Sequence, residues 1–321
     1  MRNTRIVEML EVTEAAALAA GRWMGKGDKH AADNAAVEAM RTAFDALDID
    51  GEIVIGEGER DEAPMLYIGE KVGAGGEPID IAVDPLEGTN LCAYGQPNSL
   101  AVLAFAPKGT LLNAPDTYMW KIATGPSAAD VIHIDASPTE NVRNVARALK
   151  RPVEDIVVCI LERERHNDLI AEVRAAGARI RLISDGDVFG AVATSIEGTG
   201  IHLYMGAGGA PEGVLAAAAM RCIGGCFMGR FAFRSPEERA RAEKMAKCDL
   251  DGVLDMDCLV NSDQAAFIAT GVTDGEMLRG VKYFGQGSRT HSVAMENETG
   301  TVRFVETVYR SGAEKFWVRM D

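Results

Sequence analysis

The sequence of 321 residues has few residues of the kinds that hold zinc or build a disulfide framework. Its six cysteines include no Cys-x-x-Cys pair, and its five histidines form no His-Glu-x-x-His motif. Cysteines without regular spacing are typical of free thiols in a reducing compartment. These absences argue against zinc chemistry.

The chain also lacks long apolar runs and an excess of basic residues. The longest apolar stretches, such as residues 214–220, are far shorter than the ~20 residues that a membrane span needs. The N-terminus has no hydrophobic signal core, so we expect a cytoplasmic protein. The net charge of −15 disfavours nucleic acid or an anionic membrane as a partner. If the substrate is an anion, metal ions and local arginines must overcome this field.

The composition is that of a soluble globular protein, with 47% apolar and 25% charged residues. The length suits roughly two domains of ordinary size. The run Arg151-Pro152-Val153-Glu154 is the candidate boundary. We therefore expect an N-terminal metal-binding and catalytic domain over residues 1–154 and a C-terminal substrate-binding domain over residues 155–321.

Helical and strand patterns alternate along the chain. In the N-terminal half, apolar periodicity predicts helices over about 6–24 and 33–47. Asp33 stands at the start of the second helix, where it would serve as an N-cap or as a ligand. Strands are expected over 52–55, 79–83, 99–105 and 118–123.

The C-terminal half has a βαβαβ order, which predicts a mostly parallel sheet with helices on its faces. A hairpin around Asn297-Glu298-Thr299-Gly300 is expected near the end. The alternating elements are a strand over 156–161, a helix over 165–176, a strand over 179–183, a helix over 188–196 and a strand over 201–205.

Acidic residues follow the strands predicted over 52–55 and 79–83. Asp84 and Glu87 stand three residues apart before a Gly-Thr turn, a placement that suits hard cations. Glu57, Glu59 and Asp61 crowd a glycine-rich turn upstream. If these carboxylates converge, their repulsion amounts to several kcal/mol per close pair, and divalent cations would relieve it. The alternatives are that Asp84 caps a turn, that Glu87 faces solvent, or that two separate acidic loops form.

Three further clusters follow strands, where open α/β sheets bind ligands. Arg163-Glu164-Arg165 offers guanidiniums that suit a phosphate, or it is an exposed helix start. Asp185-Gly186-Asp187 would accept hydrogen bonds from sugar hydroxyls, or it caps a helix. The glycine-rich stretch 206–213 opens a helix whose amides favour an anion, although Glu212 could reach a metal instead.

Taken together, several stretches resemble the class II (GlpX-type) fructose-1,6-bisphosphatases, within the lithium-sensitive, metal-dependent phosphatases that include inositol monophosphatase. The resemblance covers nearly the whole chain. It is carried by Gly25-Lys26-Gly27-Asp28-Lys29 with Ala31-Ala32-Asp33, Ile53-Val54-Ile55-Gly56-Glu57-Gly58-Glu59 with residues 61–70, Leu112-Asn113-Ala114-Pro115-Asp116 with Tyr118-Met119, Asp185-Gly186-Asp187, Gly208-Gly209-Ala210-Pro211-Glu212-Gly213 and Thr270-Gly271-Val272-Thr273.

The resemblance implies a residue set for each part of a site. Mn²⁺ or Mg²⁺ would be held by Asp33, Glu57, Asp84, Glu87 and Glu212. The attacking water would be oriented and deprotonated by Asp61, Glu59 and Thr89. The bisphosphate would contact Glu87, Gly88, Thr89, Tyr118, Arg163, Glu164, Arg165, Asp185, Gly186, Asp187 and Gly209.

The resemblance also implies an α/β fold with an α+β N-terminal half, arranged as a five-layer α-β-α-β-α sandwich in a homo-oligomer. The implied activity is hydrolysis of the C1 phosphate of fructose 1,6-bisphosphate, a step of gluconeogenesis. Sedoheptulose-1,7-bisphosphatase activity and inositol monophosphatase activity are alternatives, although the arginine cluster favours a bisphosphate. A non-enzymatic module that binds metal or sugar phosphate is a third alternative, against which the water-activating residues argue.

Overall fold

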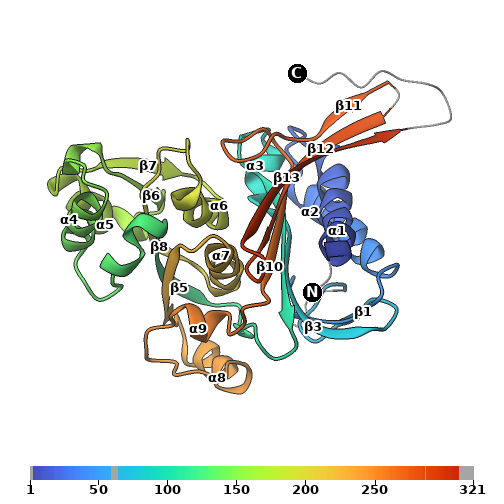
Figure 1. Cartoon of the computed structure of the whole chain (residues 1–321), viewed down its shortest axis with the longest axis horizontal. Helices are drawn as coiled ribbons and strands as arrows, with labels where there is room; N and C mark the ends of the chain where they lie inside the picture. Colours follow the sequence, from blue (N-terminus) through green and yellow to red (C-terminus); the bar gives the residue numbers. More distant parts are fainter. Residues whose placement is uncertain (1–2, 59–63, 286, 311–321) are drawn as a thin grey trace.

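The computed structural model describes residues 3–58, 64–285 and 287–310. The predictions for Glu59 and Asp61 therefore lie outside the described residues. Figure 1 shows two sheets separated by a layer of helices, with a further layer of helices on each outer side. The expected α/β fold with five layers in the order α-β-α-β-α is confirmed.

The larger sheet combines strands from both ends of the chain. Within the described residues it has eight strands: β1 (Ile49–Ile55), β2 (Lys71–Val72), β3 (Glu77–Glu87), β4 (Leu100–Pro107), β10 (Ala266–Gly271), β11 (Lys282–Phe284), β12 (Gly287–Glu296) and β13 (Thr301–Arg310). Their order is β11-β12-β10-β4-β3-β1-β2, with β13 alongside β12. β1 and β3 are parallel, whereas β4 is antiparallel to both β3 and β10. β12 and β13 form the expected terminal hairpin.

Strand β3 is longer than predicted and contains an irregularity that matters for the site. Asp84 pairs with Val102 and Glu87 with Leu100, so β3 has one residue more than β4 between these pairs. Side chains alternate along a strand, and residues three apart would normally point to opposite faces. The extra residue shifts this alternation, so Asp84 and Glu87 come to the same face. Pro85 has no N–H to donate, which suits it to this bulge.

The smaller sheet consists, within the described residues, of five strands in the order β7-β6-β8-β5-β9. These are β5 (Tyr118–Thr124), β6 (Val157–Leu161), β7 (Arg179–Ile183), β8 (Leu203–Gly209) and β9 (Cys226–Ala232). β6 is parallel to β7 and β8, as the βαβαβ order predicts. β5 is antiparallel to β8 and β9, so the expected mostly parallel sheet is in fact mixed.

Helices fill the layers around the two sheets (Figure 1). α1 (Asn3–Gly21) and α2 (Lys29–Phe44) cover the outer side of the larger sheet, and α4 (Pro138–Ala148) and α5 (Asn167–Ala175) cover that of the smaller sheet. α6 (Asp187–Val192) and α7 (Ala210–Cys222) lie between the sheets. The remaining helices are α3 (Thr89–Ala93), α8 (Pro236–Met245), α9 (Met256–Leu259) and the 3₁₀ turns η1 (Pro126–Val131), η2 (Val153–Asp155), η3 (Glu164–His166) and η4 (Ala193–Ser195).

The middle helix α7 explains the apolar run noted in the sequence. Every residue from 213 to 220 is buried, because sheets pack on both sides of this helix. A helix buried all round has no polar face to keep in solvent. The largest buried cluster accordingly joins residues of both sheets to α7. Of the helices in the described ranges, none is long and apolar enough to cross a membrane.

The second helix begins earlier than the sequence pattern indicated. Asp28 is the N-cap of α2, and its side chain accepts a hydrogen bond from the backbone N of Ala31 at 3.0 Å. The expected start near Asp33 was wrong, because the glycines at 25 and 27 made the preceding segment resemble a helix break. Asp33 lies within the helix, so its carboxylate is not needed for capping.

Sheet membership does not follow the order of the chain. β5 precedes the candidate boundary at residues 151–154 and pairs with β8 and β9, which follow it. β10 to β13 also follow the boundary, and they join the sheet that contains β1, β3 and β4. The division into residues 1–154 and 155–321 stays a prediction.

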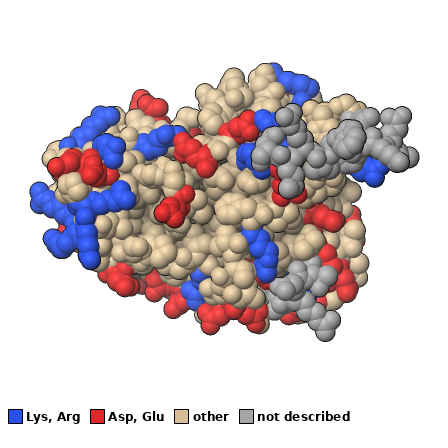
Figure 2. All heavy atoms as spheres, turned by 45° about the horizontal axis from the view of Figure 1, so that its top comes forward, with Lys and Arg blue, Asp and Glu red and all other residues tan. Residues whose placement is uncertain are grey.

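On the face drawn in Figure 2, Lys and Arg gather at the end of the molecule that holds α4 and α5.

Candidate active site

A cavity of about 260 Å³ opens where α2, β1, β3, α3 and α7 meet. Its lining includes the predicted residues Asp33, Glu57, Asp84, Thr89 and Glu212, which come from segments far apart in the chain. The fold therefore brings most of the predicted metal and catalytic set together. The whole lining is Asp33, Ile55, Gly56, Glu57, Gly58, Ile68, Val83, Asp84, Thr89, Asp116, Pro211, Glu212 and Leu215.

Three carboxylates form the centre of this acidic group. Ligand atoms of Asp84, Glu87 and Glu212 all lie within 4.8 Å of one another. Asp84 Oδ1 accepts a hydrogen bond from the backbone N of Leu86 at 3.0 Å, and Glu87 Oε1 accepts one from the backbone N of Val188 at 2.9 Å. A backbone amide thus orients each of these two carboxylates through one oxygen, and the two side chains also hydrogen-bond each other.

Glu212 is held differently, in the first turn of α7. A Cβ atom built on Gly209 would stand 2.0 Å from Glu212 Oε2, so a larger residue there would displace this carboxylate. Glu212 Oε2 is buried and has no hydrogen-bond partner within the described ranges. An ionised carboxylate buried in this way is costly unless a cation compensates it. The set of oxygen ligands suits a hard divalent cation such as Mg²⁺ or Mn²⁺.

Burial and mutual repulsion raise the pKa values of these acids. Burial, together with the charges of Asp33, Asp84 and Glu212, raises the pKa of Glu57 to about 8. Burial raises the pKa of Asp84 to about 6, and burial with the charge of Asp187 raises the pKa of Glu212 to about 7. A bound divalent cation would favour the ionised forms, because it replaces repulsion by attraction.

The raised pKa values predict how the stability of the metal-free protein depends on pH. These acids bind more protons folded than unfolded, so their contribution to the free energy of unfolding falls from about pH 5 to about pH 8. We expect the melting temperature of metal-free protein to fall across this range, by roughly 2 °C per kcal/mol lost. Differential scanning calorimetry checks this. Saturating Mn²⁺ should remove the fall, and a melting temperature that rises steadily from pH 5 to pH 8 without metal would contradict the assignment.

Thr89 is placed on the cavity wall by a tight turn. Gly88 adopts a left-handed conformation with φ 76°, which glycine tolerates without strain, and Thr89 begins α3 directly after it. The hydroxyl of Thr89 donates to the backbone O of Leu86 at 3.2 Å. This hydrogen bond leaves the oxygen lone pairs available to a ligand in the cavity. Glu59 and Asp61 lie outside the described residues, and their roles stay predictions.

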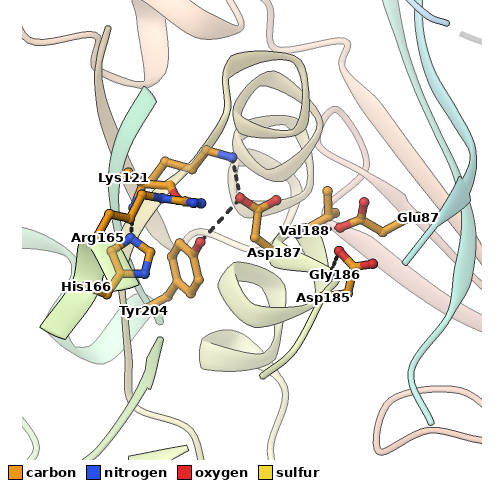
Figure 3. A network of polar contacts seen from close by, with 10 residues as sticks. Glu87, Lys121, Arg165, His166, Asp185, Gly186, Asp187, Val188 and Tyr204 are labelled. Atoms are coloured by element: carbon orange, nitrogen blue, oxygen red, sulfur yellow. Dashed lines mark hydrogen bonds and ion pairs between the residues drawn. The ribbon is translucent and has the colours of Figure 1, made fainter. Parts of the chain in front are cut away.

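A second polar group lies beside the carboxylates and centres on Asp187. Asp187 Oδ2 accepts hydrogen bonds from Lys121 Nζ at 2.7 Å and from the hydroxyl of Tyr204 at 3.4 Å (Figure 3). All three side chains are buried. Gly208 makes room for this group, since a Cβ there would stand 1.8 Å from Asp187 Oδ2. The predicted substrate residue Asp187 is therefore already engaged in the protein interior through one oxygen.

Arg165 and His166 make hydrogen bonds to β8 at the point where β8 no longer pairs with β6. β6 pairs with β8 only near Leu203 and Tyr204. Farther along β8, the backbone N of Ala207 donates to His166 Nε2 at 2.8 Å, and its carbonyl accepts from Arg165 Nε and Nη2 at 3.2 and 2.7 Å (Figure 3). These side chains supply the hydrogen bonds that a neighbouring strand would otherwise make. They hold the segment that leads to Glu212.

His166 is a neutral imidazole in this arrangement. Its Nδ1 lies 2.7 Å from the carbonyl of Leu161 and donates to it, while Nε2 accepts from Ala207. Burial lowers the pKa of His166, and the guanidiniums of Arg165 and Arg163 lower it further. Gly206 leaves space for the ring, because a Cβ there would stand 3.1 Å from it.

The other predicted substrate residues lie around these groups. Asp185 accepts a hydrogen bond from the Asn90 side chain at 3.1 Å, which links the start of α6 to α3. Arg163 is partly buried and donates to the carbonyl of Glu162 at 2.9 Å, and Glu164 is exposed. Tyr118 pairs with Gly209 in the sheet, and the Arg165 guanidinium carbon lies 4.8 Å from its ring centroid. Gly186 is left-handed, with φ 82°, just before α6.

Sequence reasoning did not single out every residue of the site. Asp116 lines the cavity, and its only signal was its place in a stretch that carries the family resemblance. Lys121 is a buried lysine in an otherwise mostly apolar strand, which is an unusual position for a charge and was a usable signal. Arg234 lies 4.4 Å from the Tyr118 ring, and nothing in the local sequence indicated this contact.

The five-layer arrangement, with an acidic cavity beside the carboxyl ends of β1, β3 and β8, is the α/β architecture of the sugar phosphatase type. A model of the family described as bacterial fructose-1,6-bisphosphatase, glpX-encoded, matches residues 3–309. The chain belongs to this family of phosphatases, as the resemblance indicated.

The names of similar proteins agree with membership of this family. The chain is 46% identical to a protein of Synechococcus sp. (strain JA-2-3B'a(2-13)), with 98% of each chain covered. It is 47% identical to a protein of Thermosynechococcus vestitus, with 96% of each covered, and 48% identical to one of Synechococcus elongatus, with 96% of this chain and 97% of that one covered. All three relatives are named D-fructose 1,6-bisphosphatase class 2/sedoheptulose 1,7-bisphosphatase.

Proposed function

We propose that this protein hydrolyses the C1 phosphate of fructose 1,6-bisphosphate to fructose 6-phosphate and inorganic phosphate, with Mn²⁺ or Mg²⁺ as cofactor. The observation that carries this proposal is the group of Asp84, Glu87 and Glu212, whose ligand atoms lie within 4.8 Å of one another. The buried and unpartnered oxygen of Glu212 in the described structure supports a cation there. Membership of the family supplies the substrate class.

The carboxylates have a defined task in this proposal. Asp33, Glu57, Asp84, Glu87 and Glu212 would hold the divalent cations, which supply charge neutralisation at the phosphate and activation of a water molecule. Because phosphoryl transfer needs little covalent help, placement of charge and orientation provide most of the rate. The hydrogen bonds from Leu86 and Val188 fix the orientation of Asp84 and Glu87 before substrate arrives.

The water-activating residues stand next to this group in the sequence. Asp61 would take the proton of the attacking water, with Glu59 and Thr89 orienting it. The Thr89 hydroxyl proton points to the carbonyl of Leu86, so its oxygen is an acceptor toward the cavity. No cysteine or histidine nucleophile is needed for this reaction. His166 is buried and engaged on both ring nitrogens, which removes it from such a role.

A second substrate is supported by the names of the relatives. All three of the relatives named above carry both activities in their names, so we propose sedoheptulose 1,7-bisphosphate as an additional substrate. Both sugars carry phosphates at the two ends of the molecule. The same phosphate contacts would therefore serve either substrate, and only the length of the sugar between them differs.

We further propose that the protein works in the cytoplasm, and that it forms the homo-oligomer that the family resemblance implied. The six cysteines are all free thiols, which supports a reducing compartment. The partner of this site is a small-molecule sugar bisphosphate, in addition to the divalent cations.

A phosphate-release assay tests the proposed function directly. The full chain is incubated with fructose 1,6-bisphosphate, sedoheptulose 1,7-bisphosphate, fructose 1-phosphate and inositol monophosphate, each with and without Mn²⁺. We expect Mn²⁺-dependent release of one phosphate per molecule from the two bisphosphates, with a higher kcat/KM than for the monophosphates. Binding without turnover would favour a non-enzymatic module, and a preference for inositol monophosphate would overturn the substrate assignment.

Arg165 provides a residue-level test of the bisphosphate assignment. Arg165→Ala should raise KM for fructose 1,6-bisphosphate by about tenfold or more, the effect of losing a charged hydrogen bond of roughly 1.5–3 kcal/mol. The same change should matter much less for fructose 1-phosphate. Steady-state kinetics on both substrates checks this.

Arg165→Ala also loses the contact with the carbonyl of Ala207, which can affect stability. Arg163→Ala is therefore the comparison variant. Loss of the Ala207 contact should lower the melting temperature of Arg165→Ala, whereas within the described residues Arg163→Ala removes only a protein contact with the carbonyl of Glu162. If KM for the bisphosphate is unchanged in both variants, these arginines do not bind the distal phosphate.

A further inference from the structure

We propose that Arg234 joins Arg165 in binding the phosphate that is not cleaved, and so helps to select a bisphosphate over a monophosphate. This inference rests on the proposed function and deepens it. Arg234 lies in the segment between β9 and α8, far in sequence from the predicted arginine cluster. The feature that brings it to the site is the ring of Tyr118.

The ring of Tyr118 has two guanidiniums beside it. The guanidinium carbon of Arg234 lies 4.4 Å from the ring centroid, and that of Arg165 lies 4.8 Å from it. Cations at this distance are attracted by the electron-rich face of an aromatic ring. In the sheet, Tyr118 pairs with Gly209 of β8 and Ala232 of β9, and Arg234 follows two residues after Ala232. The smaller sheet thus places Arg234 beside residues that were predicted to bind substrate.

Glu238 orients Arg234 through one edge of its guanidinium. Glu238 Oε1 accepts from Arg234 Nε at 2.7 Å, and its other oxygen accepts from the backbone N of Arg234 at 2.8 Å and from the Thr117 hydroxyl at 2.7 Å. Glu238 also lies 2.5 Å from Arg234 Nη2. Glu238 is buried, with 7% of the residue exposed. Its ion pair with Arg234 is therefore more fixed than a pair between two exposed side chains.

In both arginines, the edge of the guanidinium formed by Nε and Nη2 makes the contacts within the protein. Arg165 uses Nε and Nη2 for the carbonyl of Ala207, just as Arg234 uses Nε and Nη2 for Glu238. For neither Nη1 is a hydrogen-bond acceptor found within the described ranges. Arg165 also has no carboxylate within 4.0 Å in the part of the chain that the structure describes. Each of the two guanidiniums over the Tyr118 ring thus has donors left for an anion with several acceptor oxygens, such as a phosphate.

The position of this pair relative to the acidic cavity fits a substrate with phosphates at both ends. Asp116 lines the cavity and acts electrostatically on Arg234: the Glu238 hydrogen bond raises the pKa of Arg234, and the charge of Asp116 contributes in the same direction. Tyr118 follows Asp116 by two residues. Arg234 is not among the residues that line the cavity, so it would contact the far end of a substrate rather than the cleaved phosphate.

Arg239 offers a matched control within α8. Its guanidinium also lies over an aromatic ring, at 5.6 Å from the centroid of Phe233, and it is also paired with a carboxylate. However, Asp251 accepts from both Nη1 and Nη2 of Arg239, each at 2.7 Å, so the outer edge of this guanidinium is occupied. Arg239→Ala removes an equivalent charge without touching Tyr118.

The experiment compares Arg234→Ala, Arg234→Lys and Arg239→Ala in the full chain with saturating Mn²⁺. The substrates are fructose 1,6-bisphosphate and fructose 1-phosphate, which has the cleaved phosphate but lacks the distal one. For Arg234→Ala we expect KM for the bisphosphate to rise by about tenfold or more, as for a lost charge-assisted hydrogen bond. Its kcat on the bisphosphate and its kcat/KM for fructose 1-phosphate should stay within about twofold of the parent values.

The controls separate binding from folding. Arg239→Ala should match the parent chain, and Arg234→Lys should recover only part of the affinity, because an ammonium lacks the planar fork. The Arg234 side chain is 52% exposed, so its variants should fold, and their melting temperatures verify this.

Three outcomes decide the question. An unchanged bisphosphate KM in Arg234→Ala overturns the inference, and so does an equal loss of kcat/KM on both substrates, which would indicate a structural role. If the parent chain does not hydrolyse fructose 1,6-bisphosphate at all, the proposed function fails instead, whatever the variants do.

Discussion

Asp61→Asn should lower kcat by a factor on the order of 10²–10⁴, the range expected when a general base is lost. The substitution is nearly isosteric and removes only charge and basicity, so the fold and the affinity for substrate should survive. A large fall in kcat with little change in the substrate Kd would locate the defect in the chemical step. Turnover, substrate binding and bound metal should be measured on one preparation.

Glu62→Gln is the matched control for this variant, since it removes a neighbouring carboxylate to which no role is assigned. It should retain nearly normal turnover. Loss of bound metal in Asp61→Asn would move Asp61 from the water-activating group to the metal ligands. Nearly normal turnover in Asp61→Asn would remove it from the mechanism and leave Glu59 and Thr89 to be tested in the same way.

Removing divalent cations with a chelator should abolish turnover and lower the melting temperature, and Mn²⁺ or Mg²⁺ should restore both. The activity should be lost because the carboxylates have no other cation to neutralise the phosphate. The stability should change because a ligand that binds only the folded state adds RT ln(1 + [L]/Kd), which is about 2.7 kcal/mol at 100 times Kd. Phosphate release and calorimetry before and after dialysis against a chelator check this.

Glu212→Gln tests the contribution of one predicted metal ligand to this result. It removes one of the mutually repelling buried charges, so the metal-free variant should be at least as stable as the metal-free parent. Its gain in stability on adding Mn²⁺ should be smaller, because metal affinity should fall by more than the roughly 10–100-fold that loss of an outer-shell contact causes. Glu243→Gln, an exposed helical carboxylate, should behave like the parent. Full activity after confirmed metal removal would contradict the whole assignment.

Arg165 has two proposed roles, one in binding phosphate and one in holding β8. Arg165 was predicted to bind phosphate, and the structure adds a strand-like contact with the carbonyl of Ala207. Its position beside Tyr118 therefore depends on the backbone of β8, whereas the position of Arg234 depends on the carboxylate of Glu238. Because each guanidinium has its own anchor, loss of one should leave the other in place beside Tyr118.

The sequence by itself determined the local elements and the chemical type of the site. Apolar periodicity predicted the strands that became β1, β3 and β7 to within a few residues, because burial of one face imposes its period on the chain. The acids after the first two of these strands, together with glycines that allow close approach, already indicated a site for hard cations. The motifs, taken together, were specific enough to indicate the family that the comparisons show.

Only the tertiary structure decided which of these residues meet. The bulge in β3 turns Asp84 and Glu87 to one face, and it depends on pairing with β4, which periodicity within one strand does not encode. Glu212 reaches them because α7 is packed between the two sheets, and Arg234 reaches Tyr118 because β9 lies beside β5. These are contacts between distant segments, set by how the layers pack, so no local pattern in the sequence specifies them.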